Sequence, residues 1–492
     1  MVDFIKQVSK ALPCSFEFCG NAPRIREWDF LLEKVKSLFG TQDMTVGSPT
    51  KCLLMFSVPL LIGNFAQLLY NTVDSIVVGK YVGDVALSAI GITSPLLTLF
   101  LVLFMAIGSG VMVMVSQYFG AKEYRHLEYT IGNAITLIAI SSIILTILGL
   151  LLTDWMLKII KTPSEPYEMA RIYMLICFLG MAGDGFYNIM SGILRGMGES
   201  IFPLAVLIFT TILNIVLDVW FVAGLNMGIA GAAWATIIGK TLSAVVCLIK
   251  VLMIRGFINL KPSHLLLKKD TVLTICRLGI PNGIAQAILF LSTIVVQRLI
   301  NSMGYMVTAA STALLRVDSF AVIPSQTFNM CSSTFTGQNV GAGNLERVKK
   351  GCHSVFKMSM TVTIVMIILM LIFGHWMIGL FTTTQELIDM GYSFILVMIP
   401  TYLFLAIGQS FSGVIHGAGD AIGPMWISLI TNTVIRIPCA YILAYLTVSA
   451  AYPAGHPFSN FISLDIALFI NVIATLIYFR LGRWKNKSIT GK

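Results

Sequence analysis

Charged side chains are scarce in this chain of 492 residues: Asp, Glu, Lys and Arg together make up 11% of it. Soluble proteins usually carry about 25% charged residues. Apolar residues make up 57% of the sequence, and its mean hydropathy is +0.85. Because so few charges cannot cover the surface of a soluble protein of this length, the composition predicts a membrane protein.

Acidic residues are the rarer sign, with 23 Asp and Glu against 33 Lys and Arg, a net charge of +10 and a pI of about 9.1. In a soluble chain this excess would favour nucleic-acid binding. However, the sequence has no nucleic-acid-binding motif and no stripe of basic and aromatic residues. The excess instead fits positive residues held on one side of a membrane. We therefore expect no nucleic-acid partner.

Motifs for metal, redox or catalytic chemistry are missing as well. The nine cysteines include no CxxC pair and lie mostly in apolar segments, which is typical of reduced packing thiols. The six histidines are scattered, no DxD lies in a loop, and no Walker pattern is present. These absences argue against a membrane-embedded enzyme, so we expect no catalytic residues and no cofactor.

The first 45 residues lack the uninterrupted apolar core of a secretory signal. Segment 28–39, WDFLLEKVKSLF, has apolar residues at helical spacing and could lie on the membrane surface. A disordered extension is the alternative, and Met44 offers a second start.

Long apolar runs account for most of the remaining chain. A membrane-spanning helix needs about 20 largely apolar residues. Twelve such runs are present, at 53–79, 86–117, 127–152, 168–193, 201–223, 228–254, 272–302, 306–336, 347–374, 388–414, 421–447 and 460–481. The sequence therefore predicts an all-α membrane protein with twelve transmembrane helices.

The basic residues predict the orientation of these spans, because Lys and Arg concentrate on the cytosolic side. With the N-terminus inside, the inside segments hold 25 of the 33 Lys and Arg residues. The outside loops hold little beyond Lys80, Lys158, Lys161 and Arg171. We expect both termini in the cytosol of a bacterium and the protein in its cytoplasmic membrane.

The chain also repeats itself. SQYFGAKEYRH at 116–126 is echoed by GQNVGAGNLER at 337–347, and LRGMGESIFP at 194–203 by IHGAGDAIGP at 415–424, with an offset of 221 residues. The repeat contains six spans, so both copies enter the membrane from the same side and are parallel repeats. We expect two six-helix lobes around a central cleft. The predicted parts are an extension (1–43), an N-lobe (44–254), a cytosolic linker (255–271), a C-lobe (272–482) and a basic tail (483–492).

Polar residues gather at one depth of the predicted N-lobe. Asp74 and Asp218 each lie roughly 8 Å from the outer end of their spans, and Thr236 lies about 12 Å deep. Asn214 and Asp218 share a helix face because they are four residues apart. These groups could bind a small cation, or the two carboxylates could share a proton. A purely structural role, with hydrogen bonds to neighbouring helices, is the alternative.

The second repeat lacks this pair of acids. At the repeat offset, Val295 or Val296 stands for Asp74, and Cys439 or Ala440 stands for Asp218. The C-lobe instead holds Arg298, Arg316, Asp318 and Arg436. The asymmetry places the coupling site in the N-lobe. We interpret Asp318 either as neutralised locally by Arg316 or as part of a second acidic site, and Asp184 as structural.

Several motifs together resemble the MATE (multidrug and toxic compound extrusion) transporters, with the MepA- and DinF-like bacterial branches the most similar. They are DMTVGSPTKCLLMFSVPLLIGN, LYNTVDSIVVG, LRGMGES, LNIVLD and TGQNVGAGNLERVKKG, and the likeness spans roughly 44–485. The resemblance implies export of cationic amphipathic compounds driven by protons or sodium ions. It implies coupling residues Asp74, Asn214, Asp218 and Thr236, which could also form a sodium site. Gln67 matches a position in the cavity, where Asp318 is our second candidate. Acids of another branch, in its seventh and tenth spans, are missing inside the corresponding spans.

The leading hypothesis is a secondary antiporter that exports organic cations or drugs by rocking of the two lobes, functions as a monomer, and has lipid as its other partner. A lipid-linked precursor flippase is the alternative, with positive charge from Arg298, Arg316 and Arg436.

Overall fold

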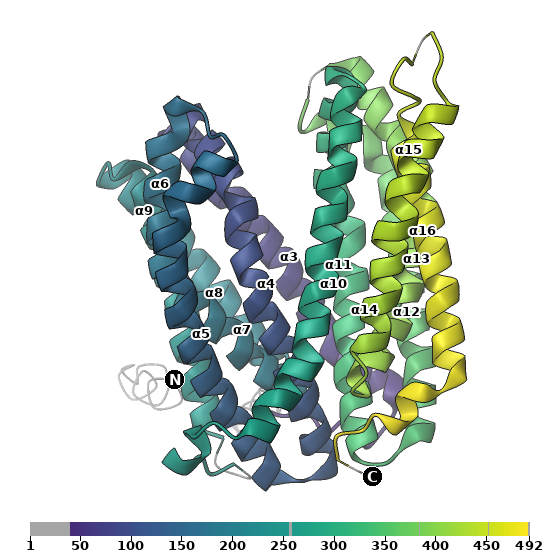
Figure 1. Cartoon of the computed structure of the whole chain (residues 1–492). Coiled ribbons are helices and arrows are strands. Elements are labelled where there is room, and N and C mark those ends of the chain that lie inside the picture. The colour runs from purple at the N-terminus through teal and green to yellow at the C-terminus, as the bar shows by residue number, and fades with distance from the viewer. Residues whose placement is uncertain (1–39, 255–257, 383, 451, 491–492) are drawn as a thin grey trace, which may run out of the picture. The chain divides into compact units, whose positions relative to one another are not determined.

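The computed structural model describes residues 40–254, 258–382, 384–450 and 452–490, and their regular structure is helical throughout. The expectations for the N-terminal extension, including the amphipathic segment 28–39, lie almost wholly outside the described residues. Within the described residues, eleven single helices are long and apolar enough to cross a membrane, and a bent pair makes a twelfth span. This confirms the predicted fold class (Figure 1).

The first repeat contains α3 (Pro49–Tyr81), α4 (Asp84–Ala121), α5 (Tyr124–Ile159), α6 (Ser164–Leu179), α7 (Met181–Gly196), α8 (Ile201–Asp218) with the π-helix η1 (Val219–Gly224), and α9 (Gly228–Leu252). A short 3-10 helix, η2 (Pro262–Leu265), follows. The second repeat contains α10 (Lys269–Ser302), α11 (Tyr305–Gly341), α12 (Leu345–Gly379), α13 (Gln385–Gly417), α14 (Ile422–Leu429), η3 (Ile430–Ile435), α15 (Arg436–Leu446) and α16 (Phe458–Leu481), followed by η4 (Arg483–Asn486).

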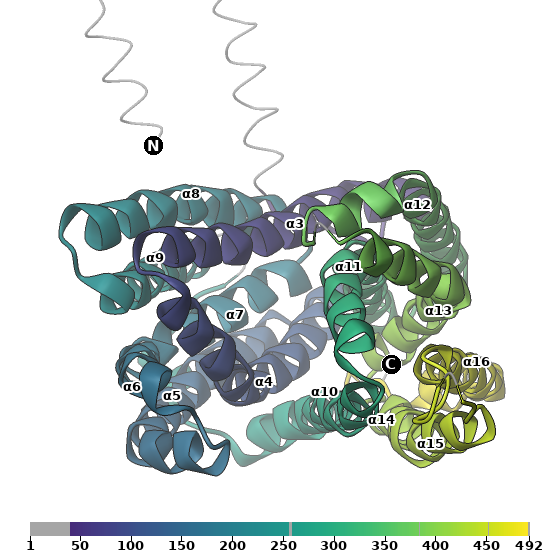
Figure 2. The same ribbon diagram turned by 90° about the horizontal axis from the view of Figure 1, so that it is seen from above.

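Helices α3–α9 form an N-terminal bundle, and α10–α16 form a C-terminal bundle (Figure 2). Matching turns repeat between the two: Gly83 (φ +106°) precedes α4, and Gly304 (φ +102°) precedes α11, 221 residues later. Both glycines hold a backbone conformation that a side chain rarely allows. The sequence repeat is therefore also a repeat of backbone turns.

The predicted span at 168–193 is a bent pair, because α6 and α7 meet at an angle of 47° at Gly180. A Cβ at Gly180 would overlap the side chain of Ile237 on α9. The glycine therefore lets α9 approach the bend closely.

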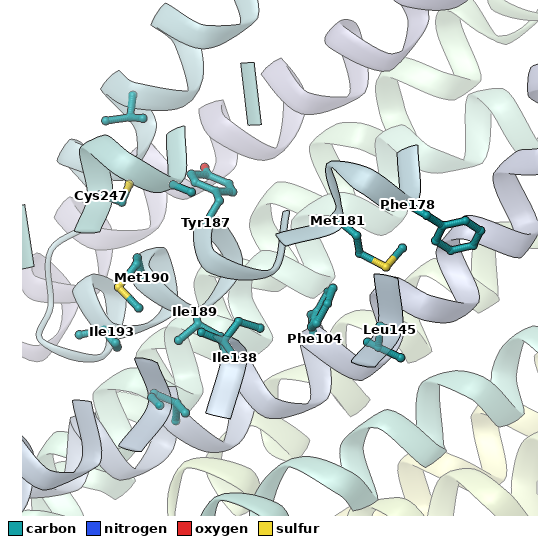
Figure 3. Packing of buried hydrophobic residues seen from close by; sticks show 14 of the residues in the cluster. Phe104, Ile138, Leu145, Phe178, Met181, Tyr187, Ile189, Met190, Ile193 and Cys247 are labelled. Atoms are coloured by element: carbon teal, nitrogen blue, oxygen red, sulfur yellow. The ribbon is translucent and has the colours of Figure 1, made fainter. Parts of the chain in front are cut away.

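Close packing holds the N-terminal bundle together. Phe104 on α4, Ile138 on α5, Phe178 on α6 and Ile189 on α7 belong to one buried cluster (Figure 3). Because lipid is as apolar as these side chains, membrane helices associate through close packing that small residues permit. Gly149 shows this, since a Cβ there would overlap the ring of Phe178.

The two bundles meet where α4 and α11 end. We call this side of the structure, near Lys122 and Arg347, the basic end; it is the lower side in Figure 1. A Cβ at Gly120 would overlap the carbonyl of Gln338, and a Cβ at Gly341 would overlap that of Gln117. The backbones of α4 and α11 therefore touch here.

Local expectations from the sequence can be checked at two places. Asn344 caps α12, since its side chain accepts a hydrogen bond from the Arg347 N–H at 3.1 Å, as its position before the helix predicted. The cysteines at seven described positions are free, as expected of packing thiols.

Candidate functional site

Three helices of the N-terminal bundle bring the predicted coupling residues together. Asp74 lies on α3 and is 8% exposed, while Asn214 and Asp218 on α8 are almost completely buried. Asp218 is the last residue of α8, directly before the π-helical turn η1. Such turns occur frequently at functional sites because they interrupt the regular hydrogen bonds of a helix.

The Asn214 amide connects α8 to α9. In the amide orientation that satisfies both of its groups, Asn214 donates to Asp218 Oδ2 at 3.0 Å and accepts from the backbone N–H of Thr236 at 3.2 Å. The hydroxyl of Tyr70 on α3 donates to Thr236 Oγ1 at 3.3 Å. Asn214, Asp218 and Thr236 therefore belong to one network, and Tyr70 joins α3 to it.

Two carboxylate oxygens of this region are left without partners. Asp74 Oδ1 and Asp218 Oδ1 are both buried, and neither has a hydrogen-bond partner among the described residues. The two carboxylates are near enough for their charges to interact. Burying an unpaired charge is costly, so this arrangement favours uptake of a positive ion or a proton.

A cation held here would use mixed oxygen ligands. Within the described part of the chain, no three His, Cys, Asp or Glu side chains are close enough to bind a metal together. Asn214 and Thr236 would have to supply amide and hydroxyl oxygens beside the two carboxylates. A proton would need only the carboxylates.

A cavity of about 310 Å³ lies beside this network. Its wall includes Gln67 and Tyr70 from α3, Asn214 from α8, and Gly239 and Lys240 from α9. The structure thus places Gln67, a predicted cavity residue, next to the network.

Asp318, the other predicted cavity residue, lies elsewhere. It is half-buried on α11 in the C-terminal bundle, close to Tyr402 of α13. Arg316 is exposed, and no ion pair joins it to Asp318 in the described structure. Residues two apart on a helix do not face each other, so the proposed local neutralisation by Arg316 is not what the structure contains.

The sequence reading missed a lysine in the same cavity wall. Lys240 Nζ lies 2.8 Å from Asp184 Oδ1 of α7, and the two side chains are only 18% and 22% exposed. The same ammonium lies 6.0 Å from the ring centroid of Tyr70. The signal was available, because a charged residue inside a predicted span is by default a functional candidate.

A pair of glutamines joins the bundles at the basic end. Gln117 of α4 donates to the carbonyl of Gly417 at 2.9 Å and accepts from the N–H of Ile489 at 2.8 Å. Both partners come from the second half of the chain.

Gln338 of α11 makes the matching pair of bonds in the other direction. It donates to the carbonyl of Gly196 at 3.0 Å and accepts from the N–H of Met44 at 2.8 Å. Gln117 and Gln338 are 221 residues apart, as are Gly196 and Gly417. We call these two glutamines and their four hydrogen bonds the glutamine clasp. It closes the basic end with internal two-fold symmetry.

Comparison with known sequences identifies the family. The profile of the MatE family matches residues 59–220 and 281–442, which are the two repeats. The chain belongs to the MatE family. The MATE resemblance noted in the sequence is therefore confirmed.

The MatE chain matches curated relatives over most of their length. It is 27% identical over 464 residues to the probable multidrug resistance protein YoeA of Bacillus subtilis (strain 168), covering 92% of this chain and 97% of that one. It is 22% identical to the multidrug export protein MepA of Staphylococcus aureus (strain MRSA252), covering 80% and 87%.

Solved structures agree with the MatE fold. One described as the outward-facing conformation of a multidrug resistance MATE family transporter has a TM-score of 0.84 and 21% identity, and covers 90% of this chain and 97% of that chain. Another, of a MOP superfamily transporter from Pyrococcus furiosus with reverse polarity of its binding pocket, has a TM-score of 0.82 and 22% identity, covering 90% and 97%. This MatE protein is therefore a multi-span membrane transporter and not an enzyme.

Proposed function

We propose that this MatE protein is a secondary antiporter that exports organic cations or drugs in exchange for protons or sodium ions. The observation that carries the proposal is the pair of buried, unpartnered carboxylate oxygens of Asp74 and Asp218 beside a cavity. The multidrug names of the relatives support the substrate class.

The exchange follows from competition for one conformational state. A proton or sodium ion neutralises Asp74 and Asp218, and Asn214 and Thr236 hold the network in place. If ion and substrate favour different states of the two bundles, each shifts the population away from the other. Binding of the inward-moving ion then drives release of the organic cation.

We further propose that the bundles open alternately to the two sides of the membrane. Positive residues favour the cytosol, so the basic end would be cytosolic, together with both termini. The glutamine clasp would then close the cytosolic side in the conformation described here. The similarity to an outward-facing relative supports this assignment. We expect the monomer, surrounded by lipid of the plasma membrane, to be the working unit.

The test is efflux of ethidium from vesicles that contain the purified protein, with proton and sodium gradients imposed separately. Wild-type protein should export the dye under at least one gradient. Asp74→Asn and Asp218→Asn should each reduce gradient-driven efflux at least about 100-fold, because each removes a charge that binds the coupling ion.

Asp154→Asn is the matched control. Asp154 forms an exposed ion pair with Arg171 at 2.8 Å, far along the chain from the network, so its loss should leave efflux unchanged. Wild-type rates in Asp74→Asn or Asp218→Asn would contradict the proposed coupling site.

The flippase alternative would need a positively charged cavity. Arg298 and Arg316 are exposed, whereas Arg436 is buried, with its Nε unpartnered among the described residues. Arg436 alone is a specific observation in favour of an anionic headgroup. Movement of a lipid-linked anion in the same vesicles, with no ethidium efflux, would favour this alternative.

A further inference from the structure

Lys240 is a charged residue that the proposed coupling mechanism does not yet use. It lies on α9, one helical turn from Thr236, and therefore on the same side of the helix. Its ammonium forms a 2.8 Å ion pair with Asp184, and its side chain lines the cavity beside Asn214. The N-terminal bundle thus combines two unpartnered acids with a cation that is part of the chain.

The geometry gives this ammonium a route towards the acids. Lys240 Nζ lies 6.0 Å from the Tyr70 ring, and the Tyr70 hydroxyl bonds to Thr236. Asn214 lies on the other side of Thr236 and donates to Asp218. Lys240 and Asn214 line the same cavity, which leaves room for the lysine side chain to change its direction.

The chemistry of the two groups is complementary. An ammonium carries three donors on a flexible four-carbon stem. Asp74 Oδ1 and Asp218 Oδ1 are buried acceptors without partners in the described structure. They are the kind of acceptor that an ammonium, a sodium ion or a proton can satisfy.

We infer that Lys240 is a tethered competitor of the coupling ion. Its ammonium rests on Asp184 while the ion occupies the Asp74–Asp218 pair, and it turns to that pair when the ion leaves. Asp184 is thus the resting partner that holds the ammonium away from the site. Lys240 is a positioning residue for ion release, and the inference rests on the proposed antiport function.

The inference predicts opposite effects for the two partners of the ion pair. Asp184→Asn removes the resting partner, so the ammonium should occupy the acids and raise the ion concentration for half-maximal ethidium efflux at least about tenfold. Lys240→Met removes the competitor and should lower that concentration at least about threefold, with slower maximal efflux. Lys240→Arg keeps the charge and should lie closer to wild type.

The double variant Asp184→Asn/Lys240→Met decides between competition and structure. Without the ammonium, the loss of Asp184 no longer matters, so the double variant should match Lys240→Met. If the ion pair only stabilised the fold, the double variant would be no better than Asp184→Asn, and this result would overturn the inference. An unchanged ion dependence in Lys240→Met would overturn it as well.

A second measurement does not depend on transport. In an ion-free structure of Asp184→Asn, Lys240 Nζ should lie within hydrogen-bond distance of Asp74 or Asp218. An ammonium still beside position 184 would refute the inference. It would leave the proposed antiport function intact, because that function is tested separately by Asp74→Asn and Asp218→Asn.

Discussion

The glutamine clasp makes a quantitative prediction about the closed basic end. Gln338→Ala removes two hydrogen bonds that join the bundles, those to Gly196 and Met44. A protein hydrogen bond contributes about 0.5–1.5 kcal/mol net, so the closed state should lose about 1–3 kcal/mol. This corresponds to a shift of roughly 5–150-fold towards conformations in which the basic end is open.

The assay is labelling of a cysteine buried under the clasp. Ser116 is fully buried, and a Cβ at Gly337 would overlap its hydroxyl, so it lies on the contact between the bundles. In a cysteine-free background, Ser116→Cys should react slowly with a membrane-impermeant maleimide applied from the basic side. Adding Gln338→Ala should raise the labelling rate by the same 5–150-fold factor.

Two comparisons make the test specific. Gln117→Ala should produce a similar increase, because it removes the symmetry-related bonds to Gly417 and Ile489. Gln297→Ala is the matched control, since Gln297 is bonded only within α10, to Asn301 at 2.9 Å, and it should leave labelling unchanged. A folded Gln338→Ala protein whose labelling rate stays within about twofold of the parent would refute the clasp.

Three further predictions concern other parts of the fold. Burial raises the pKa of Glu199, outside the spans, to about 7, against the opposing charge of Lys250. The folded state therefore holds this proton more tightly, and stability should fall, by on the order of 3 kcal/mol, as pH rises from about 4.5 to 7. Glu199→Gln should flatten this decline in melting temperature, and an unchanged profile would contradict the assignment. Asn133→Ala removes three bonds to His264, Leu266 and Lys268 and should speed limited proteolysis of the linker after α9. Gly341→Ala should increase Ser116→Cys labelling, because its methyl group would overlap the Gln117 carbonyl; slower labelling would argue against backbone contact.

Much of the fold could be predicted because lipid imposes a simple rule on the sequence. Each span needs a long apolar run, so the twelve runs corresponded to the observed helices within a few residues. The bend at Gly180 escaped prediction, because its cause is the contact with Ile237 of α9, about 57 positions later in the chain. A glycine alone does not reveal which helix will approach it.

The polar network was predicted in part by counting depth along each span. Asp218, Asn214 and Thr236 lie together because residues at equal depth on neighbouring helices can meet. Tyr70 was missed, since an aromatic residue in an apolar run gives no sign that its hydroxyl is bonded. The partner of Lys240 could not be predicted either, because its ion pair with Asp184 depends on how α7 and α9 rotate against each other.

The glutamine motifs show a further limit of sequence reading. GQNVGAGNLER was interpreted as a helix end followed by a helix start, and the Asn344 cap confirms that part. The role of Gln338 lies in the other repeat, where it bonds to Gly196 and Met44. A repeat tells which residues correspond, but it does not tell that corresponding residues cross over to each other's bundle.

The two-fold relation is kept at the basic end and broken at the proposed ion site, and the proposed mechanism explains the difference. A closure between two bundles is strengthened when each contributes the same bonds, as Gln117 and Gln338 do. An ion that moves the bundles relative to each other needs only one of them to bind it. At the repeat offset, Cys439 or Ala440 stands for Asp218, and buried Arg436 stands for Asn214. A guanidinium at that position would repel a cation from the C-terminal bundle, so ion loading would act on the N-terminal bundle alone while the symmetric clasp responds as a unit.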